Sequence, residues 1–312
     1  MSRVLIIIIT LIYSLNIYSQ TPRSAEGFGE RGLKRYMQGD YDGAIVDYTQ
    51  VIDLTSRLDT KDGFSPGNSF AESKSSDATL WRKNVRVIDP RTADAYLKRG
   101  NAFFAKSDLD NAINDYNRAL DIVPASAGVY FCRGTAWLIK KDLDRALADY
   151  EKAVKFDPNF AKGYIGRGMA RLDMGEAKAA FEDYDQAIKL SPRDTTGYYY
   201  RGDARLQSGD REGALLDFEY ALKLDPRCAN PYLGRGTVRF YNQDFAGAIN
   251  DFSTAIDLDQ RLAQAYRNRG YAYLAQGKED EAEKDFTVAV TMAPLLGPEI
   301  DAKVKIIRSW RK

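Results

Sequence analysis

Residues 93–126 read ADAYLKRGNAFFAKSDLDNAINDYNRALDIVPAS, and this stretch decides the fold. Its Arg-Gly dipeptide at 99–100 recurs at 31–32, 133–134, 167–168, 201–202, 235–236 and 269–270. The step is 34 residues from Gly100 onward, and the step from Gly32 to Gly100 is 68 residues, twice that period. A fixed period of this length indicates a stack of repeated structural units.

Each repeat contains two apolar stripes with helical spacing. In the quoted stretch, Tyr96, Gly100 and Phe103 are spaced to lie on one face of a first helix. An alanine stands twelve residues after each repeat glycine and an aromatic residue sixteen after, as in Ala112 and Tyr116, on the second helix. The small residues predict closely approaching helices, and a proline ends most repeats. Two helices cannot bury their apolar face alone, so neighbouring repeats must stack.

The 34-residue period and the Gly…Ala…Tyr/Phe…Ala…Pro pattern resemble the tetratricopeptide repeat family. Residues 25–56 match the pattern as a first repeat, and residues 93–296 match it as six more. The resemblance implies an all-α fold, a right-handed solenoid of antiparallel helical hairpins. It also implies that the first helix of each repeat lines a concave groove, where the family generally holds peptides or partner proteins.

Residues 57–92 interrupt the repeat. They lack the Arg-Gly dipeptide, and Ser56 to Thr79 is rich in serine and glycine, which indicates a loop. We interpret the segment as a degenerate repeat that keeps only its second helix, near 77–88, and closes at Pro90. The alternative is a flexible insertion after the first repeat. We favour plain flexibility for the loop over a role in binding.

Residues 297–312 predict a capping helix, because the last repeat of a solenoid leaves an apolar face to cover. Pro298 suits the first helical position, and the apolar stripe is Ile300, Val304 and Ile307. The basic residues are expected in solvent: Lys303, Lys305, Arg308 and Arg311. The alternative is a basic amphipathic helix that lies on a membrane.

Residues 1–19 have the architecture of a signal peptide. Arg3 precedes an apolar run from Val4 to Tyr13, and Ile17 and Ser19 suit the −3 and −1 positions of a cleavage site. We therefore predict export to a periplasmic or secreted location. The alternative is an uncleaved membrane anchor at residues 4–18, although that run is shorter than the ~20 apolar residues of a spanning helix.

The composition excludes most enzyme classes. The chain of 312 residues has 45 basic and 44 acidic side chains, so it carries no electrostatic footprint for nucleic acid. It has no histidine and two cysteines, which excludes Ser-His triads, Cys-His dyads and four-cysteine zinc sites. It also has no P-loop, G-x-G-x-x-G or nucleophile elbow. We predict a non-enzyme with no catalytic residue, no cofactor and no metal site.

The two cysteines, Cys132 and Cys228, lie almost three periods apart. Stacked helices are separated by about 8–10 Å, so three repeats exceed the ~7 Å limit between the Cα atoms of a disulfide. We predict that both thiols are free in the monomer.

Two charged columns accompany the repeat. An arginine precedes every repeat glycine, and an aspartate precedes every aromatic residue of the second helix: Arg31, Arg99, Arg133, Arg167, Arg201, Arg235 and Arg269; Asp47, Asp115, Asp149, Asp183, Asp217, Asp251 and Asp285. Charges that recur in every repeat usually serve stacking. We predict a ladder of partly buried Arg–Asp pairs, and the alternative is a charged binding surface.

The first-helix positions that the resemblance assigns to the groove differ between repeats. The candidate partner-binding residues are Leu97, Asn101, Phe131, Thr135, Lys162, Tyr199, Asp203, Tyr241, Arg267 and Tyr271. Tyrosine offers contact area and a hydrogen-bonding tip, which suits peptide recognition. In the alternative interpretation, these rings only shield neighbouring first helices.

The resemblance also sets a pattern for chaperone-binding members, which hold a C-terminal carboxylate. Asn101 and Lys162 match that pattern, but Leu97, Cys132 and Gly166 do not. We therefore predict an exported scaffold for another protein or peptide partner. The alternatives are a membrane-tethered assembly factor and a solenoid that binds a small molecule or glycan.

Overall fold

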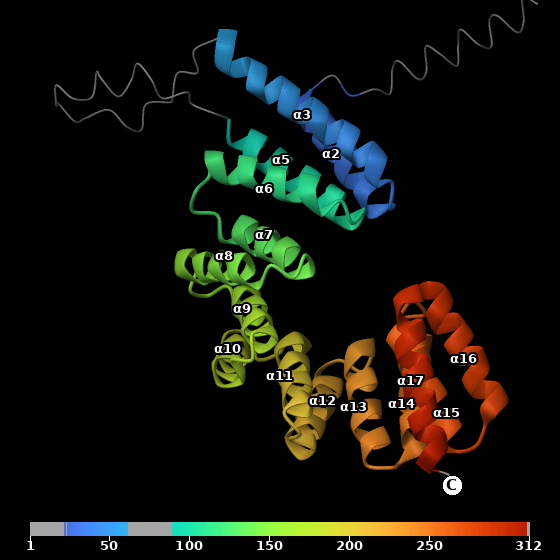
Figure 1. Ribbon diagram of the computed structural model, residues 1–312. Coiled ribbons are helices and arrows are strands. Elements are labelled where there is room, and N and C mark those ends of the chain that lie inside the picture. Colours follow the sequence, from blue (N-terminus) through green and yellow to red (C-terminus); the bar gives the residue numbers. More distant parts are fainter. Residues whose placement is uncertain (1–21, 23, 62–88, 311–312) are drawn as a thin grey trace, which may run out of the picture. The chain divides into compact units, whose positions relative to one another are not determined.

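A computed structural model describes residues 22, 24–61 and 89–310 of the chain (Figure 1). Within these residues the regular structure consists of fifteen α-helices and one 3₁₀ helix. None of the helices in this part of the chain has the length and apolar character needed to span a membrane. The predicted signal peptide at 1–19, the predicted helix near 77–88 and Arg311 lie outside the described residues.

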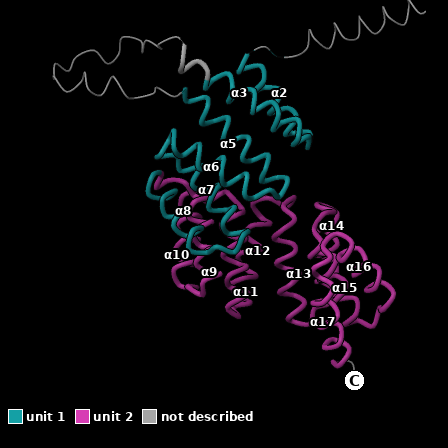
Figure 2. Tube along the Cα trace, turned by 45° about the horizontal axis from the view of Figure 1, so that its top comes forward, with its two compact units in different colours: residues 1–156 teal, residues 157–312 magenta. Residues whose placement is uncertain are grey.

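The chain divides into two compact units, residues 1–156 and 157–312 (Figure 2). The first unit contains three helical hairpins: α2 (Ala25–Met37) with α3 (Tyr41–Lys61), α5 (Pro90–Ala105) with α6 (Leu109–Ile122), and α7 (Ala127–Ile139) with α8 (Leu143–Phe156). The second contains four: α9 (Ala161–Asp173) with α10 (Ala177–Leu190), α11 (Thr195–Gln207) with α12 (Arg211–Leu224), α13 (Ala229–Tyr241) with α14 (Phe245–Leu258), and α15 (Ala263–Ala275) with α16 (Glu279–Met292). Consecutive hairpins pack on one another within each unit, which confirms the all-α solenoid fold.

The repeat glycine allows the two helices of a hairpin to approach. A Cβ atom on Gly100 would lie 2.7 Å from Cε1 of Tyr116, a distance that real side chains do not adopt. Tyr116 and Ala112 are both buried. The corresponding contact between glycine and aromatic ring recurs in the other six hairpins. The predicted packing role of these small residues is therefore confirmed.

Each hairpin turn contains one residue with a left-handed backbone, seven positions after the repeat glycine. Four turns place glycine there, as at Gly209 with φ of 86°, and the other three place Ser107, Lys141 and Gln243 there, with φ of 62–65°. An aspartate often follows and caps the second helix. Asp210, for example, accepts a hydrogen bond from the backbone N–H of Gly213 at 2.9 Å.

Helix α3 packs directly on α5, so α5–α6 is the next hairpin after α2–α3 among the described residues. The buried side chains of Thr55 and Thr92 join the two helices through a hydrogen bond of 2.8 Å. Pro90 is the first residue of α5, so this helix begins three residues earlier than the quoted repeat. Proline suits that position because its missing N–H has no partner in the first helical turn.

The C-terminal end carries the 3₁₀ helix η1 (Pro294–Leu296) and α17 (Gly297–Trp310), which packs on α15. Ile300 and Ile307 of α17 are buried in a cluster that includes Tyr271 and Phe286, and Val304 packs against it. The predicted apolar stripe of the C-terminal helix is therefore confirmed.

Candidate functional site

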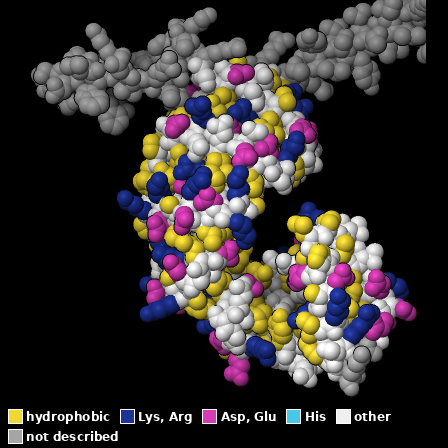
Figure 3. Space-filling view, in the orientation of Figure 1, with side chains coloured by type: hydrophobic (Ala, Val, Ile, Leu, Met, Phe, Trp, Pro, Cys, Tyr) yellow, Lys and Arg dark blue, Asp and Glu magenta, His cyan; other side chains and the backbone are white. Residues whose placement is uncertain are grey.

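The repeated arginines lie at the interface between the helices of each hairpin. In all seven hairpins the arginine pairs with the aspartate sixteen residues later, at N–O distances of 2.6–2.8 Å. These aspartate side chains are at most 7% exposed. The predicted ladder is confirmed, and these ion pairs join the two helices of each hairpin. On the visible face of each unit, charged side chains of both signs are interspersed (Figure 3).

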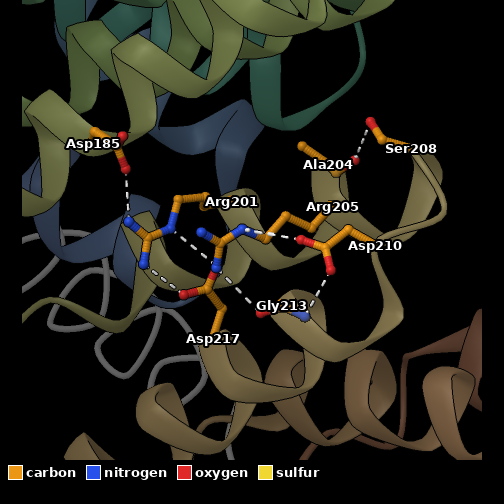
Figure 4. Close-up of polar contacts among 8 residues, drawn as sticks. All are labelled: Asp185, Arg201, Ala204, Arg205, Ser208, Asp210, Gly213 and Asp217. Atoms are coloured by element: carbon orange, nitrogen blue, oxygen red, sulfur yellow. Dashed lines mark hydrogen bonds and ion pairs between the residues drawn. The ribbon is translucent and has the colours of Figure 1, made fainter.

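Arg201 shows how fully one ladder guanidinium is occupied (Figure 4). Nη2 donates to Asp217 at 2.6 Å, and Nη1 donates to Asp185 at 2.6 Å. The hydrogen bond to Asp217 raises the pKa of Arg201 above its usual range. Arg205 Nη1 donates to the same Asp217 carboxylate at 2.7 Å. The guanidinium of Arg201 is therefore committed to structure and is not a free ligand-binding group.

Two further columns of the ladder were missed by the sequence analysis. A second arginine stands four residues after the first in four repeats: Arg35, Arg171, Arg205 and Arg239, each within 2.9 Å of the ladder aspartate. An aromatic ring stands three residues before each ladder arginine, with the guanidinium 5.3–5.7 Å from the ring centroid. Both columns have a fixed spacing in the sequence, so the same search for periodicity could have found them.

The first unit holds four of the predicted partner-binding residues, all half-buried: Leu97, Asn101, Phe131 and Thr135. Asn101 accepts a hydrogen bond from the Tyr116 hydroxyl at 2.9 Å, and Thr135 accepts one from the Tyr150 hydroxyl at 3.2 Å. The Phe131 ring lies 5.8 Å from the Tyr150 ring. These side chains therefore also hold the second-helix rings, while part of their surface stays accessible.

In the second unit, Tyr199 and Asp203 lie one turn apart on α11, and Lys162 is exposed on α9. The Tyr199 ring packs 5.1 Å from Tyr200 and 6.1 Å from Phe218, and burial raises its pKa above the usual range. Asp203 accepts a hydrogen bond from Gln207 at 2.8 Å, and burial raises the pKa of its carboxyl group. Helix α11 thus presents a half-buried acid beside half-buried aromatic rings.

The structure brings Tyr241, Arg267 and Tyr271 together at the C-terminal end of the second unit. They line a cavity of about 280 Å³ whose other wall is α17. Arg267 Nη1 pairs with Glu299 of α17 at 3.0 Å. Tyr271 packs against Phe286, with ring centroids 5.4 Å apart, and is only 6% exposed. Burial raises the pKa of Tyr271 to about 12, so its hydroxyl is protonated at neutral pH.

The contribution of α17 to this cavity was not foreseen. Lys303, which was expected in solvent, is half-buried and lines the cavity with Nζ 5.9 Å from the centroid of the Tyr241 ring. The prediction was wrong because α17 reaches beyond α15 to α13, where Trp310 packs 6.2 Å from Phe240. Glu299 and Lys303 therefore belong to the candidate site.

The site can bind ligands through apolar rings and a few polar groups. Across residues 22, 24–61 and 89–310, no three Cys, Asp or Glu side chains are grouped so that they could hold a metal ion. Neither Cys132 nor Cys228 forms a disulfide, as predicted.

The chain belongs to the tetratricopeptide repeat family. A model described as "TPR repeat" matches residues 100–138 and 236–277, and models described as "Tetratricopeptide repeat" match residues 127–160, 165–229 and 263–294. Proteins of this family are generally non-catalytic scaffolds for interactions between proteins. No curated protein matches the chain significantly.

Several solved structures share the fold. A tetratricopeptide repeat protein from Parabacteroides merdae is 18% identical, with 92% of this chain and 100% of that chain covered and a TM-score of 0.65. A chain of the APC/C hetero-tetramer Cut9–Hcn1 is 14% identical, with 90% and 55% covered and a TM-score of 0.62. Yeast Tom70 is 18% identical, with 87% and 61% covered and a TM-score of 0.56. At these identities the likeness establishes the fold alone.

Proposed function

We propose that this protein is an exported, non-catalytic scaffold that binds protein or peptide partners on the face of its first helices. One observation carries the proposal. The repeated charges are neutralised inside the hairpins, whereas the first helices keep half-buried or exposed side chains that differ from repeat to repeat, such as Phe131, Tyr199 and Tyr241. Stacking of the repeats requires the ion pairs, but it does not require the first-helix side chains to vary. Side chains that vary on a constant backbone are what specific recognition of a partner needs.

The chemistry of these side chains supports a protein or peptide partner. Tyrosine and phenylalanine provide large contact areas with little loss of side-chain freedom, and they are enriched at interfaces. Asp203 adds a half-buried carboxylate on the same helix as Tyr199. The Cut9–Hcn1 hetero-tetramer is an assembly of several chains, so this fold supports protein assembly in at least that case.

Export rests on residues 1–19 alone. An intact mass that begins at Gln20, measured on protein from the periplasm or the culture medium, supports cleavage. Protein that keeps Met1 and fractionates with membranes would instead support the tethered alternative, with residues 4–18 as anchor.

The binding face is tested with matched tyrosine variants. Residues 20–312 are immobilised, partners are captured from the native compartment and identified, and their affinity is then measured with purified partner. Tyr199→Ala and Tyr241→Ala should weaken binding about thirtyfold each, the magnitude of a typical interface anchor. Tyr220→Ala is the control, because Tyr220 lies on a second helix and is 45% exposed, close to the 44% of Tyr241.

The melting temperature of each variant separates binding from folding. If Tyr199→Ala and Tyr241→Ala lower the melting temperature but leave the affinity unchanged, the rings serve packing and the proposed face is wrong. If Tyr220→Ala weakens binding as much as they do, the partner contacts the second helices instead.

A further inference from the structure

The cavity beneath α17 has an apolar wall and one uncompensated positive charge. Phe240, Phe252 and Ile306 contribute apolar surface. Of the charged side chains in the lining, Arg267 and Glu299 neutralise each other through their ion pair at 3.0 Å. Within the described part of the chain, no carboxylate pairs with the remaining cation, Lys303. An anionic ligand would be attracted to this cavity.

A residue that lines the cavity, Tyr271, has a buried hydrogen-bonding group that lacks a partner. The hydroxyl of Tyr271 is buried, and among the residues that the structure describes no group forms a hydrogen bond with it. Buried polar groups are nearly always hydrogen-bonded, and one without a partner calls for an explanation such as a bound water or ligand. Because the phenol is protonated at neutral pH, its O–H can donate to an acceptor such as a carboxylate oxygen.

The dimensions of the cavity limit the ligand to a small molecule or to the end of a chain. Its volume is about 280 Å³, and a water molecule occupies roughly 30 Å³ in the liquid, so the cavity has the volume of roughly nine water molecules, enough for a small organic molecule. Tyr241 and Ile306 are 44% and 49% exposed, so the lining reaches solvent and a ligand has a route of entry.

We propose that this cavity binds an organic monocarboxylate with a compact apolar stem. The carboxylate would pair with Lys303 and accept the hydrogen bond of Tyr271, while the stem packs on Phe240, Phe252 and Ile306. The same chemistry is found in a free acid and in the last residue of a peptide. The inference goes beyond the proposed function, since it requires neither a macromolecular partner nor the Tyr199 face.

The test uses a matched pair of probes on the protein from residue 20 onward. Isothermal titration with 4-phenylbutyrate should show saturable binding, and 4-phenylbutanamide, which has the same stem without the charge, should bind at least tenfold more weakly. Acetyl-glycyl-phenylalanine with a free carboxylate is the third probe. Tighter binding of this peptide identifies chain ends as the source, and tighter binding of 4-phenylbutyrate identifies free acids.

Three variants assign the binding to the cavity. Lys303→Met should weaken 4-phenylbutyrate binding at least tenfold, and Tyr271→Phe about fivefold, because each removes one contact to the carboxylate. Lys305→Met is the control, since Lys305 is exposed on the same helix, and it should leave the affinity unchanged. Melting temperatures confirm that each variant is folded.

Three results would each overturn the proposal. The first is equal binding of the acid and the amide. The second is no binding of either at millimolar concentration. The third is an unchanged affinity in Lys303→Met, which remains informative even if Tyr271→Phe fails to fold.

Discussion

Arg99 donates two parallel hydrogen bonds to Asp115, from Nε to Oδ2 at 2.7 Å and from Nη2 to Oδ1 at 2.8 Å. The Asp115 side chain is 2% exposed. Phe103 stands four residues after Arg99, where the hairpin of Asp217 has a second arginine, Arg205. One arginine therefore pairs with Asp115, whereas two pair with Asp217. We expect the two hairpins to respond differently to the loss of the ladder arginine.

Arg99→Ala should lower the free energy of unfolding by about 3–5 kcal/mol, because the buried Asp115 carboxylate is left without a guanidinium. Arg201→Ala should cost less, since Arg205 remains on Asp217. Urea denaturation measures both, with Arg261→Ala as control. Arg261 is 92% exposed, and its loss should change the free energy by less than about 0.5 kcal/mol. Equal losses for Arg99→Ala and Arg201→Ala would contradict the role given to the second arginine.

The left-handed turn residue predicts a stabilising substitution. Gln243 has φ of 65°, a conformation that costs a residue with a Cβ atom about 1 kcal/mol. Gln243→Gly should therefore raise the free energy of unfolding by up to about 1 kcal/mol, less the entropy that glycine adds to the unfolded chain. Gly209→Ala is the reciprocal change, and it should be destabilising by a similar amount. A destabilised Gln243→Gly would show that the Gln243 side chain contributes more than the backbone strain costs.

Two helical glycines should respond in opposite ways to substitution by alanine, because only one of them lies against an aromatic ring of its hairpin. A Cβ atom on Gly202 would lie 2.8 Å from Cε1 of Phe218, whereas a Cβ atom on Gly128 would meet no atom within 4 Å. Gly202→Ala should destabilise by about 1–3 kcal/mol through overpacking. Gly128→Ala should be neutral or stabilising by up to about 1 kcal/mol, since alanine favours the helix. Thermal melting of the two variants compares them, and a tolerated Gly202→Ala would show that the ring can move away.

Asp203 predicts a pH-dependent difference in stability. Its pKa in the folded protein is raised by burial, so folding favours the neutral carboxyl over the carboxylate. This cost to stability is fully present above the raised pKa. It disappears as the pH falls from that pKa to the pKa of an aspartate in the unfolded chain, ~3.9. Asp203→Asn should therefore raise the urea midpoint at pH 7, and the gain over wild type should shrink on acidification.

The exposed Asp257 on α14 provides the control. The urea midpoint of Asp257→Asn relative to wild type should not show the same dependence on pH. A lower midpoint for Asp203→Asn at pH 7 would mean that a charge or hydrogen bond stabilises the carboxylate more than burial opposes it.

The repeated part of the molecule could be predicted from the sequence because each position recurs in seven equivalent environments. Gly100 facing Tyr116 and Arg99 facing Asp115 follow from spacing alone, since a residue conserved across the repeats of one chain must meet the same neighbour each time. The hairpins and the ladder were predicted for this reason.

The C-terminal helix has no equivalent elsewhere in the chain, so its exact position against the neighbouring helices could not be predicted. The stripe of Ile300, Val304 and Ile307 indicates which side is buried, but no periodicity fixes how far the helix reaches over its neighbours. The environment of Lys303 and the burial of Tyr271 depend on that placement. The cavity that they share could be found only in three dimensions.

The pairing of each ladder arginine with an aspartate of its own hairpin has a consequence for the growth of the array. A duplicated or deleted 34-residue segment carries both partners of its buried pair, so no buried charge is orphaned at the new junction. Where a ladder arginine also pairs with a carboxylate of the neighbouring hairpin, as Arg201 does with Asp185, that carboxylate is 62% exposed and can be solvated by water instead. Insertion or loss of whole hairpins therefore leaves no buried ladder charge unpaired, and the length of the proposed binding face can change while the interior stays the same.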